Sequence, residues 1–380
     1  MATEIQAQNT PVKLHHIDQL RGLAILLVIL VHVYQSQIGI RGMFGLVLNF
    51  GIVGVQLFFL LSAYTLCLSM SFRKDNSTTS DFYIRRYFRI APLYYAGILI
   101  YYMMSNIPAL NLNGPLSNHE NYTLINILSN LFFIHGMVPE ANNTIVPGGW
   151  SIGTEMIFYL IFPALFLLYE KVKTIKFLLM IPLVALVLAN VFILGVYYIK
   201  GDEAFTDLFY YFNIFNQLPV FAVGMTYFFL EKAGLIRLSK IKSAIFFLIF
   251  FLLSFVVMFK LKTNVSLGIF LVSIAFCFLF KLFKELKLDL PLLTRIGQLS
   301  FSIYIFHFLF AYPAVSVFVA LLTPGVNALL LYIFSIIITV TLAMAVALLS
   351  EKFIEQPGIK LGKLMISRLS SKTVALKSNL

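Results

Sequence analysis

The feature that most constrains this chain is a succession of long apolar runs separated by short basic segments. Hydrophobic residues make up 60% of its 380 residues and charged residues only 12%, about half the charged share of a soluble domain. Too few charged side chains are present to cover a water-soluble core holding this much Phe, Leu and Ile. The lipid bilayer must therefore be the solvent for most of the chain, and we predict an all-α integral membrane protein.

Ten segments are predicted as transmembrane helices, since one crossing needs about 20 apolar residues. These spans are 22–40, 44–70, 90–106, 150–170, 176–198, 206–230, 243–259, 265–280, 298–321 and 325–350. Residues 1–20 contain no apolar stretch, so a cleavable signal peptide is not expected. The segment 122–138 is the ambiguous one. It is short and carries Asn126, Asn130 and His135, so it is either a re-entrant or partial helix or an eleventh span.

The distribution of Lys and Arg favours ten spans, because positively charged loops are retained on the cytoplasmic side. Ten spans with the N-terminus inside place most of the 28 Lys and Arg residues in the cytoplasm, whereas a full crossing by 122–138 reverses that majority. We therefore expect a cytoplasmic segment 1–20, a transmembrane domain 21–350 and a basic amphipathic cytoplasmic tail 351–380 that fits an interfacial helix. The segment 107–149 has no Lys or Arg and becomes a long outer loop, a candidate lid or binding loop.

The formal net charge of +12 is attributed to basic loops facing anionic lipid, and no nucleic acid partner is expected. Cys67 and Cys277 both lie inside apolar runs. They indicate neither a disulfide framework nor a metal site.

Arg21 and His32 lie within or beside the first span, where a charge is costly. Their spacing of 11 residues places them on nearly the same helix face, with His32 roughly 16 Å deeper and near the middle of the membrane. A neutral imidazole at that depth is suited to proton transfer. A histidine bonded to a Ser or Tyr of a neighbouring helix, with Arg21 as an interfacial anchor, explains the pair about as well.

Arg85, Arg86 and Arg89 stand together at the predicted cytoplasmic mouth of the third span. Each guanidinium presents a planar fork of donors, so the cluster suits phosphate groups. An ordinary juxtamembrane cluster that binds anionic lipid is at least as common. A nucleotide-bearing cosubstrate would distinguish these interpretations.

Two further spans carry polar side chains. Glu155 follows Trp150 and Ser151 at the outer end of the fourth span and needs a partner, which Arg21 or His32 could supply. The ninth span carries His307 at a predicted mid-depth, together with Ser300, Ser302 and Tyr304. A lone His on a membrane helix is more often a packing residue. Two such histidines together with a membrane Glu favour a functional role over a packing role.

Five stretches, four of which contain these residues, resemble the acyltransferase-3 family of integral membrane O-acyltransferases, and a short sixth segment follows them. They are IDQLRGLAILLVILVH (17–32), GVQLFFLLSAY (54–64), FYIRRYFRIAPLYY (82–95), GWSIGTEMIFYLIFP (149–163), IGQLSFSIYIFHF (296–308) and FIEQP (353–357). Each is weak alone, but their order and coverage of nearly the whole chain are specific. Gln56 stands where the family often has an acid, and Ser62-Ala63 replaces its usual Ser-Gly. No SGNH-type soluble domain of the kind some relatives carry is expected in this chain.

The resemblance implies transfer of an acyl group, most simply acetyl, from cytoplasmic acetyl-CoA to a hydroxyl of an extracytoplasmic glycan or its lipid-linked precursor. His32 would take the proton or carry the acyl group, with Arg21 and Glu155 as the other catalytic residues, and Arg85, Arg86 and Arg89 would bind acyl-CoA without any metal. Substrate-binding or supporting roles are expected for Asp18, Ser62, Trp150, Ser151, Ser302, Tyr304 and His307. Trp150 and the outer loop could stack on a sugar. We expect an enzyme of the bacterial inner membrane that is surrounded by lipid. The sequence does not indicate its oligomeric state. A proton-coupled transporter of a small metabolite is the alternative function.

Overall fold

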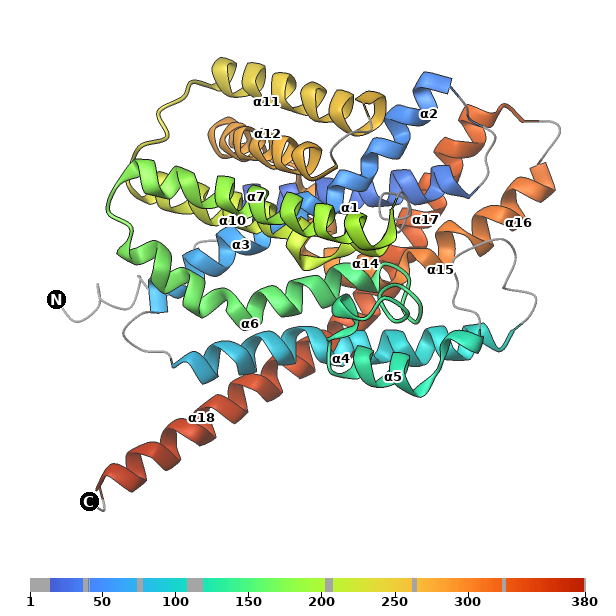
Figure 1. The fold of residues 1–380 in the computed structure, drawn as a ribbon. Helices are drawn as coiled ribbons and strands as arrows, with labels where there is room; N and C mark the ends of the chain where they lie inside the picture. The colour runs from blue at the N-terminus through green and yellow to red at the C-terminus, as the bar shows by residue number, and fades with distance from the viewer. Residues whose placement is uncertain are drawn as a thin grey trace.

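The computed structural model describes residues 14–36, 40, 42–73, 78–107, 119–201, 208–261, 265–322 and 326–378. Most of these residues are helical and none of them forms a strand, as the all-α prediction required. Residues 1–13 of the predicted cytoplasmic segment and residues 108–118 of the outer loop lie outside the described residues. Figure 1 shows long helices packed as a bundle, with α18 (Gln356–Ser378) projecting from it.

Helical elements of very different lengths precede α18 in the chain. They are α1 (His15–Gln35), α2 (Gly42–Asn49), η2 (Phe50–Val53), α3 (Gly54–Arg73), α4 (Thr79–Ser105), η4 (His119–Asn121), α5 (Leu124–Leu131), η5 (His135–Met137), α6 (Gly149–Lys171), α7 (Ile175–Lys200), α9 (Leu208–Phe212), α10 (Ile214–Lys232), α11 (Lys240–Phe255), η6 (Val256–Leu261), α12 (Val265–Leu286), α13 (Pro291–Gln298), α14 (Ser300–Phe306), α15 (Phe308–Ala311), α16 (Pro313–Leu322), α17 (Ala328–Ser350) and η7 (Glu351–Glu355).

Seven helices in the described part of the chain are long and apolar enough to cross a membrane, and α14 to α16 provide an eighth if their 41° bend is one broken span. The protein is thus an integral membrane protein. The two other predicted spans are 90–106, most of which lies in α4, and 206–230, whose described residues lie mainly in α9 and α10. Tyr and amide side chains lower the mean hydropathy of both. The count of ten crossings and the cytoplasmic placement of both termini stay predictions.

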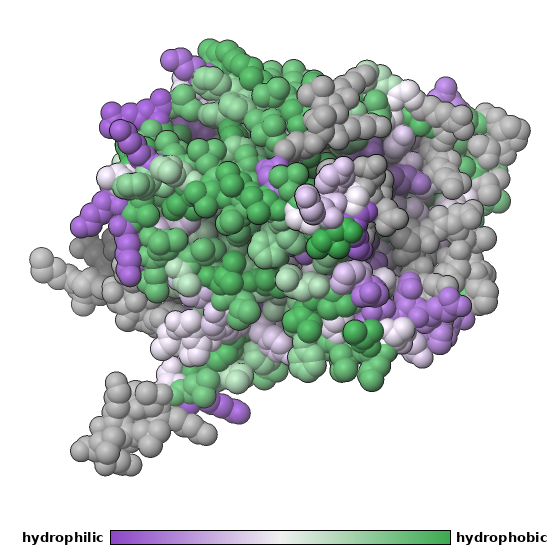
Figure 2. All heavy atoms as spheres, in the orientation of Figure 1, coloured by the Kyte–Doolittle hydropathy of each residue, from purple (hydrophilic) through white to green (hydrophobic). Residues whose placement is uncertain are grey.

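The outer helices of the bundle differ from the inner ones in how much of their surface is covered. In the most apolar 18-residue stretch of each span, only 22% is buried in α7 and 17% in the span that begins with α11. The corresponding share is 61% both in the span that includes α3 and in α12. Figure 2 shows the result on one face, where hydrophobic side chains form a broad area and hydrophilic ones gather toward its ends. Exposed apolar surface of this kind fits contact with lipid rather than water.

The segment 119–149 folds back on the bundle instead of forming a span. Its longest helix, α5, has eight residues and is about 12 Å long, too short to cross a bilayer. His135 is fully buried, with Nε2 2.9 Å from the Gly149 carbonyl and its ring stacked on Tyr94. The loop therefore fixes the start of α6, the helix that carries Ser151 and Glu155.

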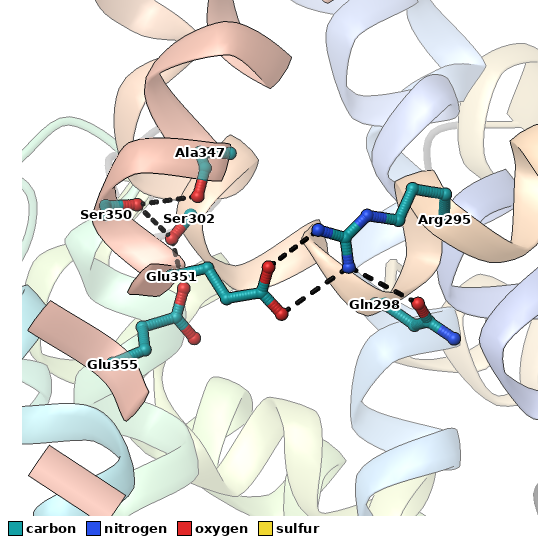
Figure 3. A network of polar contacts seen from close by, with 7 residues as sticks. All are labelled: Arg295, Gln298, Ser302, Ala347, Ser350, Glu351 and Glu355. Carbon is teal, nitrogen blue, oxygen red and sulfur yellow. Dashed lines mark hydrogen bonds and ion pairs between the residues drawn. The ribbon is translucent and has the colours of Figure 1, made fainter. Parts of the chain in front are cut away.

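The chain does not leave the bundle freely after α17, since the π-helical turn η7 continues α17 into α18. Figure 3 shows the contacts that hold this junction against α13 and α14. Arg295 pairs with both carboxylate oxygens of Glu351 at 2.7 and 3.5 Å. The Ser302 hydroxyl bonds that of Ser350 at 2.6 Å and donates to the Glu355 carboxylate. The predicted tail 351–380 is thus anchored at its first turns.

Candidate active site

A narrow cavity lies between α1, α3, α4, α6 and α14. Its volume is about 100 Å³. The polar residues that line it are Arg21, Ser62, Thr65, Arg86, Arg89, Ser151, Glu155, Tyr159, Ser300 and Tyr304. We call it the inner cavity. It brings together residues from five helices that are far apart in the sequence.

A larger cavity of about 420 Å³, which we call the vestibule, adjoins the inner cavity, and both are lined by Arg21, Thr65, Arg86 and Arg89. It lies where α1 and α4 begin and where α18 passes, and we call this end of the bundle the basic end. Five cationic side chains but only one carboxylate, that of Asp18, line the vestibule; the cations are Arg21, Arg85, Arg86, Arg89 and Lys363. Such an excess of positive charge favours a bound anion.

Arg21 and Arg86, which line both cavities, have few anionic partners among the described residues. Arg21 lies 3.5 Å from Asp18 and donates to the Thr65 hydroxyl at 3.4 Å. Arg86 lies over two aromatic rings, with its Cζ 5.8 Å from the ring centroid of Phe82 and 5.7 Å from that of Tyr159. Its Nε is buried and has no hydrogen-bond acceptor in the described part of the chain. Because a buried donor without a partner is costly, this guanidinium is suited to an anionic ligand.

Glu155 is held at the wall of the inner cavity by hydroxyl groups. Its Oε1 accepts hydrogen bonds from Ser62 at 2.5 Å and from Tyr159 at 2.6 Å. The partner expected from the sequence was Arg21 or His32, and neither of them forms a hydrogen bond or ion pair with this carboxylate. Tyr159, one helical turn after Glu155, was missed as a site residue, although its spacing of four residues could have indicated it.

Tyr304 lines the inner cavity and, unlike Arg21, Thr65, Arg86 and Arg89, does not line the vestibule. Its hydroxyl donates to the Gly148 carbonyl at 3.0 Å and accepts from Ser151 at 2.8 Å. Gly148 has φ +76°, and a Cβ there would lie 3.0 Å from both the Tyr304 hydroxyl and a ring carbon of Phe308. Glycine is therefore required at this turn by its backbone and by the close approach of Tyr304.

Neither histidine lines a cavity, but His307 packs beside Tyr304 and His32 packs beside His307. The ring of His307 is 5.7 Å from that of Tyr304 and 5.3 Å from that of His32, centroid to centroid. His307 Nδ1 lies 2.8 Å from the Tyr304 carbonyl, which can only accept, so Nδ1 carries the proton and Nε2 holds the lone pair. His307 Nε2 is buried and has no hydrogen-bond partner among the described residues.

The predicted relationship between Arg21 and His32 is only partly observed. Arg21 lines both cavities, whereas His32 lines neither and packs against the ring of His307. His32 also lies in the last turn of α1, nearer the helix end than the mid-depth that was expected. The predicted depth takes Arg21 as the start of the span, whereas α1 begins at His15.

His32 belongs to a polar group at the end of α1 opposite the basic end. Its Nδ1 lies 3.1 Å from Oε1 of Gln35. Gln35 in turn donates to Asn49 at 3.2 Å and accepts from Tyr312 at 3.4 Å. These three partners were not singled out from the sequence, because they lie in segments with no motif of their own.

Besides His307, two predicted substrate-binding or supporting residues line neither cavity. Trp150 is 5% exposed, stacked on Phe212 at 4.3 Å and in edge contact with Phe59, so its ring packs in the core and is not presented to a sugar. Ser302 bonds Ser350 and Glu355 at the α17 junction. Gln56, the departure from the family pattern, is buried and bonds Gln217 at 3.0 Å.

The remaining predicted residues are placed as follows. Asp18, Arg85, Arg86 and Arg89 line the vestibule, and Ser62, Ser151 and Tyr304 line the inner cavity. In the part of the chain that the structure describes, no group of three His, Cys, Asp or Glu side chains could hold a metal ion.

Comparison with known proteins identifies similar chains. A family model described as an acyltransferase domain matches residues 14–348. Peptidoglycan O-acetyltransferase OatA of Listeria monocytogenes is 32% identical over 199 residues, 49% of this chain and 29% of OatA. Acyltransferase MdmB of Streptomyces mycarofaciens is 28% identical over 169 residues, 42% of this chain and 41% of MdmB. The match thus covers less than half of each relative. No solved structure is significantly similar to the chain.

Proposed function

Because the chain belongs to the acyltransferase-3 family of membrane O-acyltransferases, we propose that it transfers an acetyl group from cytoplasmic acetyl-CoA to a glycan hydroxyl on the outer side. The relative OatA is named as a peptidoglycan O-acetyltransferase, which supports both the acetyl group and a cell-wall type of acceptor. The concentration of Lys and Arg at the basic end supports a cytoplasmic donor side. A bacterial inner membrane is the proposed location.

The observation that carries the proposal is the pair of adjoining cavities. The vestibule offers cationic side chains in a space of about 420 Å³, which suits the phosphates and adenosine of CoA. The inner cavity, about 100 Å³ and lined by Tyr304, suits the thin pantetheine arm. A cationic vestibule and, beside the inner-cavity residue Tyr304, the first of two adjacent histidines would match the two ends of an acyl-CoA molecule.

The proposed reaction joins the acceptor hydroxyl oxygen to the thioester carbonyl carbon. The C–O bond forms as the C–S bond breaks, and the hydroxyl proton passes to an imidazole Nε2. The CoA thiolate leaves toward the vestibule and takes up a proton, so CoA is released as the thiol. Arg21, at the boundary of both cavities, would stabilise the negative charge on the carbonyl oxygen during attack.

The two histidines have different positions in this scheme. His32 is half-buried and lies beside Gln35 and Tyr312, a polar group that an acceptor on the outer side would reach first. His307 lies between His32 and Tyr304, close to where the thioester would end. His32 therefore takes the acceptor proton or, in the covalent variant of the reaction, carries the acetyl group on its ring nitrogen.

The test is transfer of labelled acetyl from acetyl-CoA by the purified protein, with and without peptidoglycan fragments. With the fragments present, we expect label on the glycan. Without them, we expect label on the protein if His32 forms a covalent intermediate. Arg86→Gln should raise the KM for acetyl-CoA, whereas Arg237→Gln, at an exposed arginine away from both cavities, should not. Absence of transfer to any hydroxyl acceptor, or gradient-dependent transport without CoA, would overturn the proposal.

A further inference from the structure

The C-terminal helix α18 contributes side chains to the cationic vestibule. Ile359, Gly362 and Lys363 line it together with the arginines of α4. This helix lies beyond residues 14–348, the part of the chain that the acyltransferase family model matches. We infer that α18 is part of the donor site and that Lys363 binds a phosphate of acyl-CoA, an inference that rests on the proposed function.

The position of Lys363 is determined by a close contact between α18 and α4. A Cβ at Gly358 would lie 2.9 Å from the Phe88 carbonyl oxygen and 2.8 Å from Pro92 Cγ, and one at Gly362 would lie 2.8 Å from Phe88 Cβ. Two glycines four residues apart present one face of α18, so only this face can approach α4 so closely. Phe88 of α4, which both glycines approach, lines the vestibule together with the arginines.

The beginning of α18 is also held in place. The junction shown in Figure 3 fixes η7 through the bidentate Arg295–Glu351 pair and through Ser302, which donates to Glu355. Glu355 immediately precedes α18. The helix is therefore restrained both at its start and along its glycine face, so Lys363 is presented to the vestibule by a rigid element and not by a free tail.

The charges of the vestibule indicate what Lys363 would bind. Arg85, Arg86 and Arg89 come from one helix, and Lys363 faces the same space from α18. Its ammonium has no hydrogen bond or ion pair with any described residue. Several cations around one space of about 420 Å³ suit a ligand whose phosphates lie at more than one point, as the diphosphate and 3′-phosphate of CoA do.

Another lysine on the same helix provides a matched control. Lys360 is exposed on α18 as Lys363 is, and it does not line the vestibule. Lys363→Gln and Lys360→Gln remove the same charge from the same helix. A general effect of tail charge on membrane binding would change both variants equally.

The experiment measures acetyl transfer by the full-length variants with acetyl-CoA and with acetyl-dephospho-CoA, which lacks the 3′-phosphate. Lys363→Gln should raise the KM for acetyl-CoA about five- to tenfold, as expected for the loss of one charge-assisted contact, with kcat unchanged. Lys360→Gln should match the wild type. A smaller effect of Lys363→Gln with acetyl-dephospho-CoA would assign Lys363 to the 3′-phosphate, and an equal effect would assign it to the diphosphate.

A second variant tests the contact that positions the lysine. Gly362→Leu should separate α18 from Phe88 and raise the same KM while Lys363 is still present. If wild-type protein transfers acetyl but Lys363→Gln equals Lys360→Gln in both detergent and vesicles, the inference is wrong and the proposed function stands. The inference also fails if Lys363→Gln changes activity only in vesicles with anionic lipid, since Lys363 then binds a lipid headgroup. Without wild-type transfer, the proposed function itself fails.

Discussion

The imidazole rings of His32 and His307 lie 5.3 Å apart, centroid to centroid, although His32 lies in the last turn of α1 and His307 at the 41° break between α14 and α15. His32 Nδ1 faces the side-chain oxygen of Gln35, and His307 Nδ1 faces the carbonyl oxygen of Tyr304. Both rings therefore keep the lone pair on Nε2. Two such nitrogens between the donor cavity and the opposite end of the bundle form the proposed route for the proton.

His32→Ala should lower kcat for acetyl transfer by about 10²- to 10⁴-fold, the usual contribution of a general base. The amount of folded protein in the membrane and the affinity for acetyl-CoA should be unchanged, because His32 lines neither cavity. Transfer assays combined with acetyl-CoA titration measure both. Retained product formation by this variant would remove His32 from the mechanism.

His307 permits a test that separates chemistry from structure. Asn can replace the Nδ1–H donor that bonds the Tyr304 carbonyl but supplies no basic Nε2. If His307 transfers a proton, His307→Asn should fold normally and lose at least about 10²-fold in kcat. Near-normal kcat in His307→Asn, together with a marked loss in His307→Ala, would show that the residue acts only through its hydrogen bond.

Gly148→Ala should reduce kcat by displacing Tyr304, since the added Cβ would lie 3.0 Å from the tyrosine hydroxyl. Gly234 is the matched control, because it has φ +69° and open space around a Cβ. Both substitutions carry a backbone cost on the order of 1 kcal/mol. Thermal unfolding and transfer assays should therefore show similar stability losses from the backbone alone, with the activity loss confined to Gly148→Ala. Equal activities would contradict a role for Tyr304 in positioning.

Trp150 should be important for stability and not for acceptor binding. Trp150→Ala removes the stacked contact with Phe212 and should destabilise the protein by about 3–5 kcal/mol, as buried aromatic truncations do. Trp150→Phe retains a ring and should keep the KM for the glycan near its wild-type value. Unfolding in detergent and acceptor titration provide the measurements. A large rise in acceptor KM with unchanged stability in Trp150→Phe would restore the sugar-stacking interpretation.

The positions of the cavity residues show why the sequence could identify segments but not always side chains. Trp150 and Ser151 are neighbours, yet Trp150 packs on Phe212 while Ser151 reaches Tyr304. Ser302 and Tyr304 differ in the same way, since Ser302 faces the α17 junction. Successive helix positions differ by about 100° in direction. Which of them faces the cavity depends on how neighbouring helices pack.

The sequence by itself determined that the protein is a helical membrane protein of the acyltransferase-3 family, because long apolar runs can be solvated only by lipid and because the family segments are contiguous in the chain. Only the tertiary structure decided the composition of the site. It placed Arg21 beside the arginines of α4, left His32 outside both cavities against His307, and brought Lys363 into the vestibule. These contacts join helices distant in sequence, and no local pattern encodes them.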